Sequence, residues 1–163
     1  MRRIAAAGIL AIVLALGGIR LSADSHPALS GGAAGIELCP EFICGFALFV
    51  GQFQGQVNSK TASGGFVAAV VHDDLPPVGE NAAITGGQWT ITAGNKAFSG
   101  DIASGNILTL PGGTQFCITM TLEVTTGGNG ELYFTGLLDH GPFPPTIGGF
   151  VTQSPSSCSV LIP

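Results

Sequence analysis

The chain has 163 residues, of which 45% are apolar, only 9% are charged and 26 are glycine. This length supports one domain, and such sparse charge is normal for strands that carry Thr, Ser, Gln and Asn on their outer face. The glycines follow no triplet period, which excludes a collagen-like chain and indicates turns and bulges between apolar segments.

The N-terminal segment has the order of a signal peptide. Arg2 and Arg3 precede an uncharged apolar run over 4–19, and small residues follow at Ser22 and Ala23. The run is shorter than the roughly 20 residues that a bilayer-spanning helix requires. We therefore expect a signal peptide over 1–23, no membrane span after its cleavage, and a secreted, periplasmic or cell-surface protein. An uncleaved membrane anchor is the alternative.

Loss of this leader would leave an acidic chain. Ten acidic residues but only two basic ones besides histidine, Lys60 and Lys96, follow residue 23, so the formal charge beyond it is −8. Two lysines cannot neutralise a phosphate backbone. Nucleic acid is therefore excluded as an expected partner, and anionic lipid surfaces are poor ones. The chain contains no Asn-x-Ser/Thr glycosylation site, in agreement with a bacterial source.

Residues 24–36 show no apolar periodicity and are expected to form a flexible lead-in to a disulfide-stapled β domain over 37–163. The clearest strand is 115–125, where the even-numbered side chains from Phe116 to Val124 are apolar, because period two over ten residues does not fit a helix. The predicted strands are 46–57, 65–72, 88–93, 98–102, 107–110, 115–125, 131–138, 147–153 and 158–161. About eight short strands linked mostly by hairpins predict an all-β fold, a small antiparallel barrel with a sandwich as runner-up.

Four cysteines follow the predicted leader: Cys39, Cys44, Cys117 and Cys158. An even number in an exported chain predicts two disulfides, and the sequence does not choose among the three pairings. A metal site is the alternative, but neither a Cys-x-x-Cys pair nor a neighbouring histidine supports it.

Two segments share the pattern His-x-x-(Leu or Phe)-Pro-Pro. They begin at His72 and His140, and at the same offset Phe66 corresponds to Phe134. Each motif ends the second strand of a predicted hairpin. This arrangement suggests an internal duplication of a hairpin and its exit loop, with chance similarity as the alternative.

Alternation along each strand places both histidines in line with a core-facing stripe, at the mouth of the barrel. Carboxylates lie beside them in the sequence, so the candidate polar site consists of His72, Asp73, Asp74, Asp139 and His140. Such a set could bind Zn²⁺ or serve as general acid and base. The simpler interpretation is that these side chains hydrogen-bond the backbone where a strand turns into a Pro-Pro exit.

The other candidate functional residues have simpler structural explanations. Trp89, the only tryptophan, is expected in the core, with a sugar-stacking platform as the alternative. Glu123 and Glu131 flank one predicted hairpin, and paired carboxylates are the catalytic groups of glycosidases. Beside a glycine-rich turn, however, they are expected to face solvent. The chain has no Gly-x-Ser-x-Gly elbow, His-Glu-x-x-His motif or Gly-Lys-Ser/Thr phosphate loop.

Three functions follow as hypotheses. The first, favoured by the low charge and the lack of catalytic motifs, is a non-enzymatic secreted module that binds a partner or builds a surface or matrix. The second is a carrier with an apolar ligand inside the barrel, which requires a cavity of about 300 Å³ or more. The third is a metal-dependent or His/Asp acid–base enzyme, which requires His72 and His140 to approach each other. The sequence indicates no cofactor and leaves the ligand or partner unidentified.

Overall fold

The computed structural model describes residues 28–39 and 45–160. The predicted signal peptide and Cys44 lie outside these residues. Within the described part of the chain, no helix is long and apolar enough to cross a membrane.

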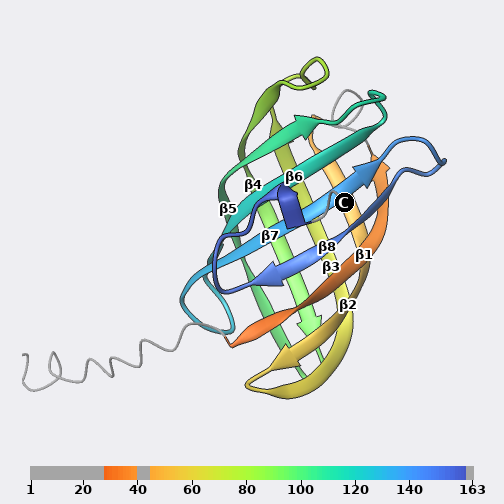
Figure 1. Ribbon diagram of the computed structural model, residues 1–163. Coiled ribbons are helices and arrows are strands. Elements are labelled where there is room, and N and C mark those ends of the chain that lie inside the picture. Colours follow the sequence, from red (N-terminus) through yellow and green to blue (C-terminus); the bar gives the residue numbers. More distant parts are fainter. Residues whose placement is uncertain (1–27, 40–44, 161–163) are drawn as a thin grey trace, which may run out of the picture.

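Eight antiparallel strands form a closed barrel in which each strand pairs with its sequence neighbours and β8 pairs with β1. Figure 1 shows the strands tilted around the barrel, with connecting turns at both ends. The strands are β1 (Leu29–Cys39), β2 (Ala47–Val57), β3 (Lys60–His72), β4 (Asn81–Ala93), β5 (Lys96–Thr109), β6 (Gln115–Val124), β7 (Gly130–Asp139) and β8 (Thr146–Thr152). The predicted all-β antiparallel barrel is confirmed.

The N-terminal strand corrects one sequence expectation. Residues 29–36, expected to belong to a flexible lead-in, lie in β1, which pairs with β2 on one side and β8 on the other. Leu29 and Ala33 are buried on its inner face. The many glycines and alanines of this segment hide the alternation, because few of its outer positions carry a polar side chain.

Strand β5 corrects a second expectation from the sequence. The predicted strand 98–102 and residues 107–109 of the predicted strand 107–110 lie in the single strand β5. An irregularity in its pairing with β6 lies between Ile102 and Ser104. A bulge of this kind shifts the alternation by one residue, so even-numbered side chains face inward before it and odd-numbered ones after it.

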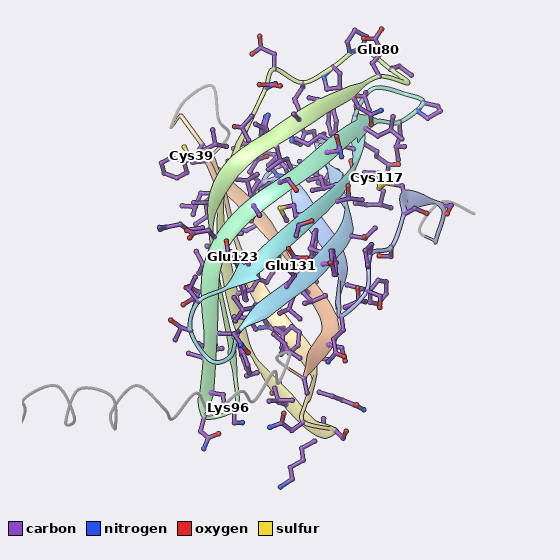
Figure 2. The ribbon with its side chains drawn as sticks, turned by 90° about the vertical axis from the view of Figure 1, so that its left-hand side faces the viewer. Cys39, Glu80, Lys96, Cys117, Glu123 and Glu131 are labelled. Carbon is purple, nitrogen blue, oxygen red and sulfur yellow. A yellow bond between two sulfur atoms is a disulfide. The ribbon has the colours of Figure 1, made fainter. Side chains whose placement is uncertain are left out.

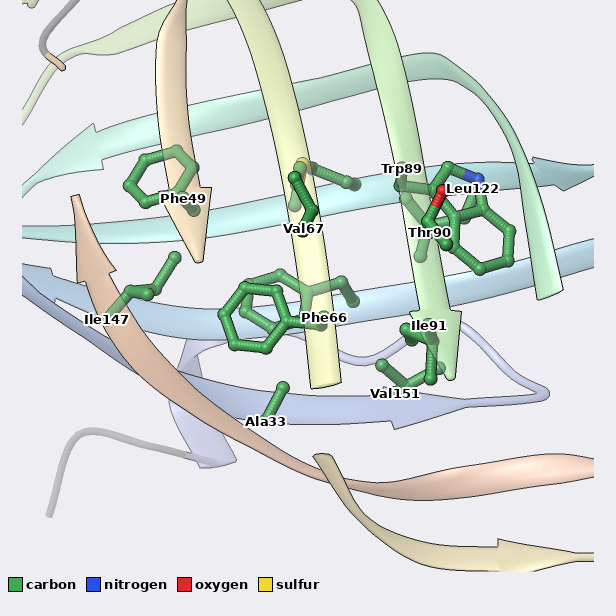
Figure 3. Close-up of a pocket in the computed structure, with 13 residues that line it drawn as sticks. Ala33, Phe49, Phe66, Val67, Trp89, Thr90, Ile91, Leu122, Ile147 and Val151 are labelled. Atoms are coloured by element: carbon green, nitrogen blue, oxygen red, sulfur yellow. The ribbon is translucent and has the colours of Figure 1, made fainter. Parts of the chain in front are cut away.

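The middle of the barrel is a packed apolar core. A cavity of only about 30 Å³ remains there, and Figure 3 shows Phe49, Phe66 and Trp89 among the side chains around it. That space holds no more than about two water molecules. The middle of the barrel therefore offers no room for a ligand.

Aromatic rings cover glycines on the inner wall. A Cβ atom added to Gly136 or Gly149 would lie 2.5 or 2.8 Å from the Phe134 ring. Phe53 lies in the same way over Gly31 and Gly55, and Phe66 over Gly51. Because glycine has no side chain, these positions leave space for the aromatic rings and let neighbouring strands approach closely.

Replacing Gly149 by alanine should lower the free energy of unfolding by about 1–3 kcal/mol, the usual cost of overpacking. The new Cβ would lie 2.4 Å from the carbonyl oxygen of Thr135 as well as against Phe134. The control is Gly148→Ala on the same strand, where nothing lies within 4 Å of the added atom, so its effect should stay within about 0.5 kcal/mol. Urea unfolding measures both, and equal losses would contradict this packing.

The C-terminal segment is fastened to the outside of the barrel. Cys117 on β6 forms a disulfide with Cys158, and Thr135 hydrogen-bonds with Ser156. Cys39 is disulfide-bonded as well, so the metal-site alternative is wrong for these three cysteines. The strand predicted over 158–161 is also wrong, because Cys158–Val160 forms a short 3₁₀ turn, η1.

Candidate functional site

One end of the barrel contains a cavity of about 480 Å³, which we call the cup. It lies where β1, β3 and β7 end and β2 begins. Most of its lining is apolar, and two carboxylates and two imidazoles lie among these apolar side chains. The described residues that line the cup are Glu37, Ala47, Phe49, Val70, His72, Asp74, Leu75, Ile107, Ile118, Leu138 and His140.

The two predicted histidines both line the cup. Because side chains alternate along a strand, His72 takes the next inward position after Val70, and His140 the next after Leu138. Their strands β3 and β7 are four places apart in a ring of eight, so the imidazoles reach the cup from opposite walls. Among the residues that the structure describes, no group of three or more His, Cys, Asp or Glu side chains is placed to hold a metal ion.

His140 is held by contacts on three sides. Its backbone amide donates a hydrogen bond to the Thr114 carbonyl over 2.8 Å. Its ring packs against Phe116, with ring centroids 5.0 Å apart and an interplanar angle of 57°. Its Nε2 atom lies 3.1 Å from Oε2 of Glu37. The side chain is thus oriented toward a carboxylate that sequence reasoning did not include in the site.

Glu37 is the functional candidate that the sequence analysis missed. It is 4% exposed and occupies the inward face of β1, four residues after Ala33 and eight after Leu29. That spacing could have revealed it, because a strand over 29–39 places all three side chains on one face. Assigning 29–36 to a lead-in removed this signal.

The contact between Glu37 and His140 is close but poorly aligned. The two atoms are at ion-pair distance, yet neither Glu37 Oε2 nor His140 Nε2 makes a hydrogen bond of acceptable geometry within the described residues. The contact is therefore weaker than its distance suggests, because a hydrogen bond weakens steeply when it is bent. Burial of an incompletely paired carboxylate costs stability, and such a cost is typical of a group kept for function.

The other predicted residues divide between the cup and the outer surface. Asp74 is exposed and reaches the rim of the cup. Asp73 is exposed, and its amide donates to the Ala83 carbonyl. The Asp73 carbonyl oxygen in turn contacts Nδ1 of His72. The contact of the His72 imidazole with this backbone carbonyl at the end of β3 agrees with the simpler, turn-stabilising interpretation for His72.

Asp139 also has this turn role. Its Oδ1 accepts a hydrogen bond from the Gly141 amide at 2.7 Å, and its Oδ2 accepts one from Nε2 of Gln115 at 3.1 Å. These bonds hold the pKa of Asp139 below its usual range, and the bond from the Gly141 amide has the largest effect. The carboxylate therefore fixes the exit from β7 and thereby the position of His140.

The depressed pKa of Asp139 predicts a pH-dependent contribution to stability. The ionised carboxylate stabilises the fold above its unfolded pKa of about 4. This contribution is lost as the pH falls through the lower folded pKa. Asp139→Ala should therefore be less stable than the parent at neutral pH, and the difference should shrink on acidification below about pH 4. Urea unfolding over a pH series checks this; a constant difference would contradict it.

The remaining candidates lie outside the cup. Trp89 is 4% exposed in the core, as expected, and its Nε1 donates to the Glu123 carbonyl at 3.2 Å. Glu123 and Glu131 face each other across β6 and β7, both exposed. Tyr133 donates to Glu131 at 2.7 Å, which raises the pKa of Tyr133. This carboxylate pair is thus on the outer surface, where the described residues form no enclosed site around it.

Comparisons of this chain with protein-family models, with curated proteins and with solved structures found no match.

Proposed function

We propose that this chain is an exported, non-enzymatic barrel that binds a small molecule in the cup. The observation that carries the proposal is the cup itself. Its volume of about 480 Å³ falls in the range of about 300–1,000 Å³ that is typical of small-molecule sites. Apolar walls with a few converging polar groups are the usual lining of such sites.

The position of the cup favours one of two forms of the binding hypothesis. A ligand in the middle of the barrel is not supported, because the cavity there is only about 30 Å³. The cup, at one end of the barrel, has space for a ligand. The proposal is therefore a binding module with an end-on site, and not a carrier that encloses its ligand completely.

The lining of the cup favours binding over catalysis. Its described residues include no serine, threonine, cysteine, tyrosine or lysine, so carboxylates and imidazoles are the only residue types there that form covalent intermediates in enzymes. The two imidazoles come from opposite walls. Export is supported by the predicted leader and by the Cys117–Cys158 disulfide, since disulfides persist in oxidising compartments.

Filling the cup should abolish binding. Isothermal titration with naphthalen-2-ylmethanol, a neutral probe with an apolar body, should detect binding to the parent protein. Ala47→Leu puts a larger apolar side chain into the space of the cup. It should therefore weaken binding of the probe by about tenfold or more. Ala47 is 2% exposed on β2, so urea unfolding should accompany the titration.

The matched control is Ala93→Leu. Ala93 is 3% exposed and lines a separate cavity of about 350 Å³ at the opposite end of the barrel. This variant should bind the probe like the parent. Equal affinities of Ala47→Leu and the parent for the probe would overturn the proposed function, as would failure of the parent to bind this probe and its charged naphthalene analogues.

A further inference from the structure

We infer that the ligand of the cup carries a protonated nitrogen on an apolar body, and that the Glu37 carboxylate receives this nitrogen. The inference rests on the proposed binding function, because it names the chemical class of the molecule bound there. Three features of the described residues carry it: an incompletely paired buried acceptor, the distribution of charge, and the aromatic lining.

The first feature is Glu37. Its side chain is 3% exposed and lines the cup, and its Oε2 atom accepts no well-aligned hydrogen bond within the described residues. An ionised carboxylate can accept about four hydrogen bonds and donates none. It therefore has acceptor capacity left beside His140, and a ligand that brings N–H donors would use that capacity. A ligand carboxylate would bring only further acceptors.

The second feature is the separation of charge along the barrel. The only lysines, Lys60 and Lys96, lie at the turns opposite the cup. Figure 2 shows Lys96 at one end of the molecule and Glu80 at the other. Asp74 adds a second carboxylate at the rim of the cup. The field at this end therefore attracts cations and repels anions.

The third feature is the apolar and aromatic surface beside the carboxylate. Phe49 lines the cup together with Ile118 and Leu138. Aliphatic and aromatic walls take up an apolar body, and an aromatic face also attracts an ammonium group. Acceptor and apolar wall together fit a primary or secondary amine attached to one or two rings or to a short aliphatic chain.

Three naphthalene probes of nearly equal size test the inference: naphthalen-2-ylmethylammonium, naphthalen-2-ylmethanol and 2-naphthoate. Isothermal titration at neutral pH should give affinities in that order, with the ammonium at least about tenfold tighter than the alcohol, as expected for a charge-assisted hydrogen bond. Glu37→Gln keeps the shape of the side chain and removes its charge. It should bring the ammonium and alcohol affinities to within about threefold of each other.

Two further variants keep the test decisive. Glu80→Gln removes a carboxylate at the same end that does not line the cup, so solvent screening should limit its effect on the ammonium preference to less than about twofold. Asp74→Asn changes an exposed rim residue and cannot disturb the core, so it should reduce the preference even if Glu37→Gln does not fold.

The outcomes separate the two claims. Binding of all three probes with similar affinity, or an ammonium preference that survives both Glu37→Gln and Asp74→Asn, overturns the inference and leaves the proposed function standing. Tighter binding of 2-naphthoate also overturns the inference. Failure of every probe to bind removes the proposed function, and the inference with it.

Discussion

Replacing Phe53 by alanine should lower the free energy of unfolding by about 3–5 kcal/mol. The Phe53 side chain is 0% exposed, and its ring lies over Gly31 and Gly55 on the inner wall. Loss of the ring would remove buried apolar area and leave a cavity in the core. Each strand of the closed barrel is hydrogen-bonded to two neighbours, so the strands cannot move freely to fill that cavity. Urea unfolding followed by Trp89 fluorescence and by circular dichroism measures the loss.

The control is a phenylalanine that makes little contact. Phe143, in the connection between β7 and β8, is 98% exposed, so Phe143→Ala should change the free energy of unfolding by less than about 0.5 kcal/mol. Losses of similar size at the two positions would show that the ring of Phe53 does not support the barrel.

Removal of the disulfide between Cys117 and Cys158 should have an effect of comparable size. The bond links residues 41 apart in the sequence, and the chain-entropy model assigns about 4 kcal/mol to a closed loop of this length. The Cys117→Ala/Cys158→Ala variant should therefore unfold at a markedly lower urea concentration than the parent. The mechanism is mainly the greater freedom of the unfolded chain.

A single substitution separates the cross-link from packing. Cys117 is 1% exposed, so its replacement also removes buried volume, whereas Cys158→Ser opens the bond and keeps the Cys117 sulfur in place. The single and double variants should lose similar stability. A loss confined to the double variant would contradict the role of the cross-link.

Much of the barrel could be predicted because its strands carry a clear period of two. In β6, Phe116, Ile118 and Met120 are buried at alternate positions, as the sequence indicates. The alternation fails where side chains are small or the strand is bulged. The small side chains of the glycine-rich β1 obscured it, and the irregularity beside Ile102 divided β5 into two predicted strands.

The candidate site was predicted in part for the same reason. His72 and His140 continue inward stripes, so alternation places them at one mouth of the barrel. The two histidines lie on opposite walls because β8 pairs with β1 and closes the barrel. This pairing joins distant parts of the sequence, so no local sequence pattern indicates it. Glu37 was missed because its strand was missed.

The central claim, that the cup holds a small molecule, is tested most directly by locating a bound probe. Nuclear Overhauser contacts between naphthalen-2-ylmethanol and the labelled methyl groups of the protein should involve Val70, Ile118 and Leu138, which line the cup. Contacts instead with Val57 and Ala62, beside the lysines at the opposite end, or with Val50 and Val67 on the outer wall, would contradict the account.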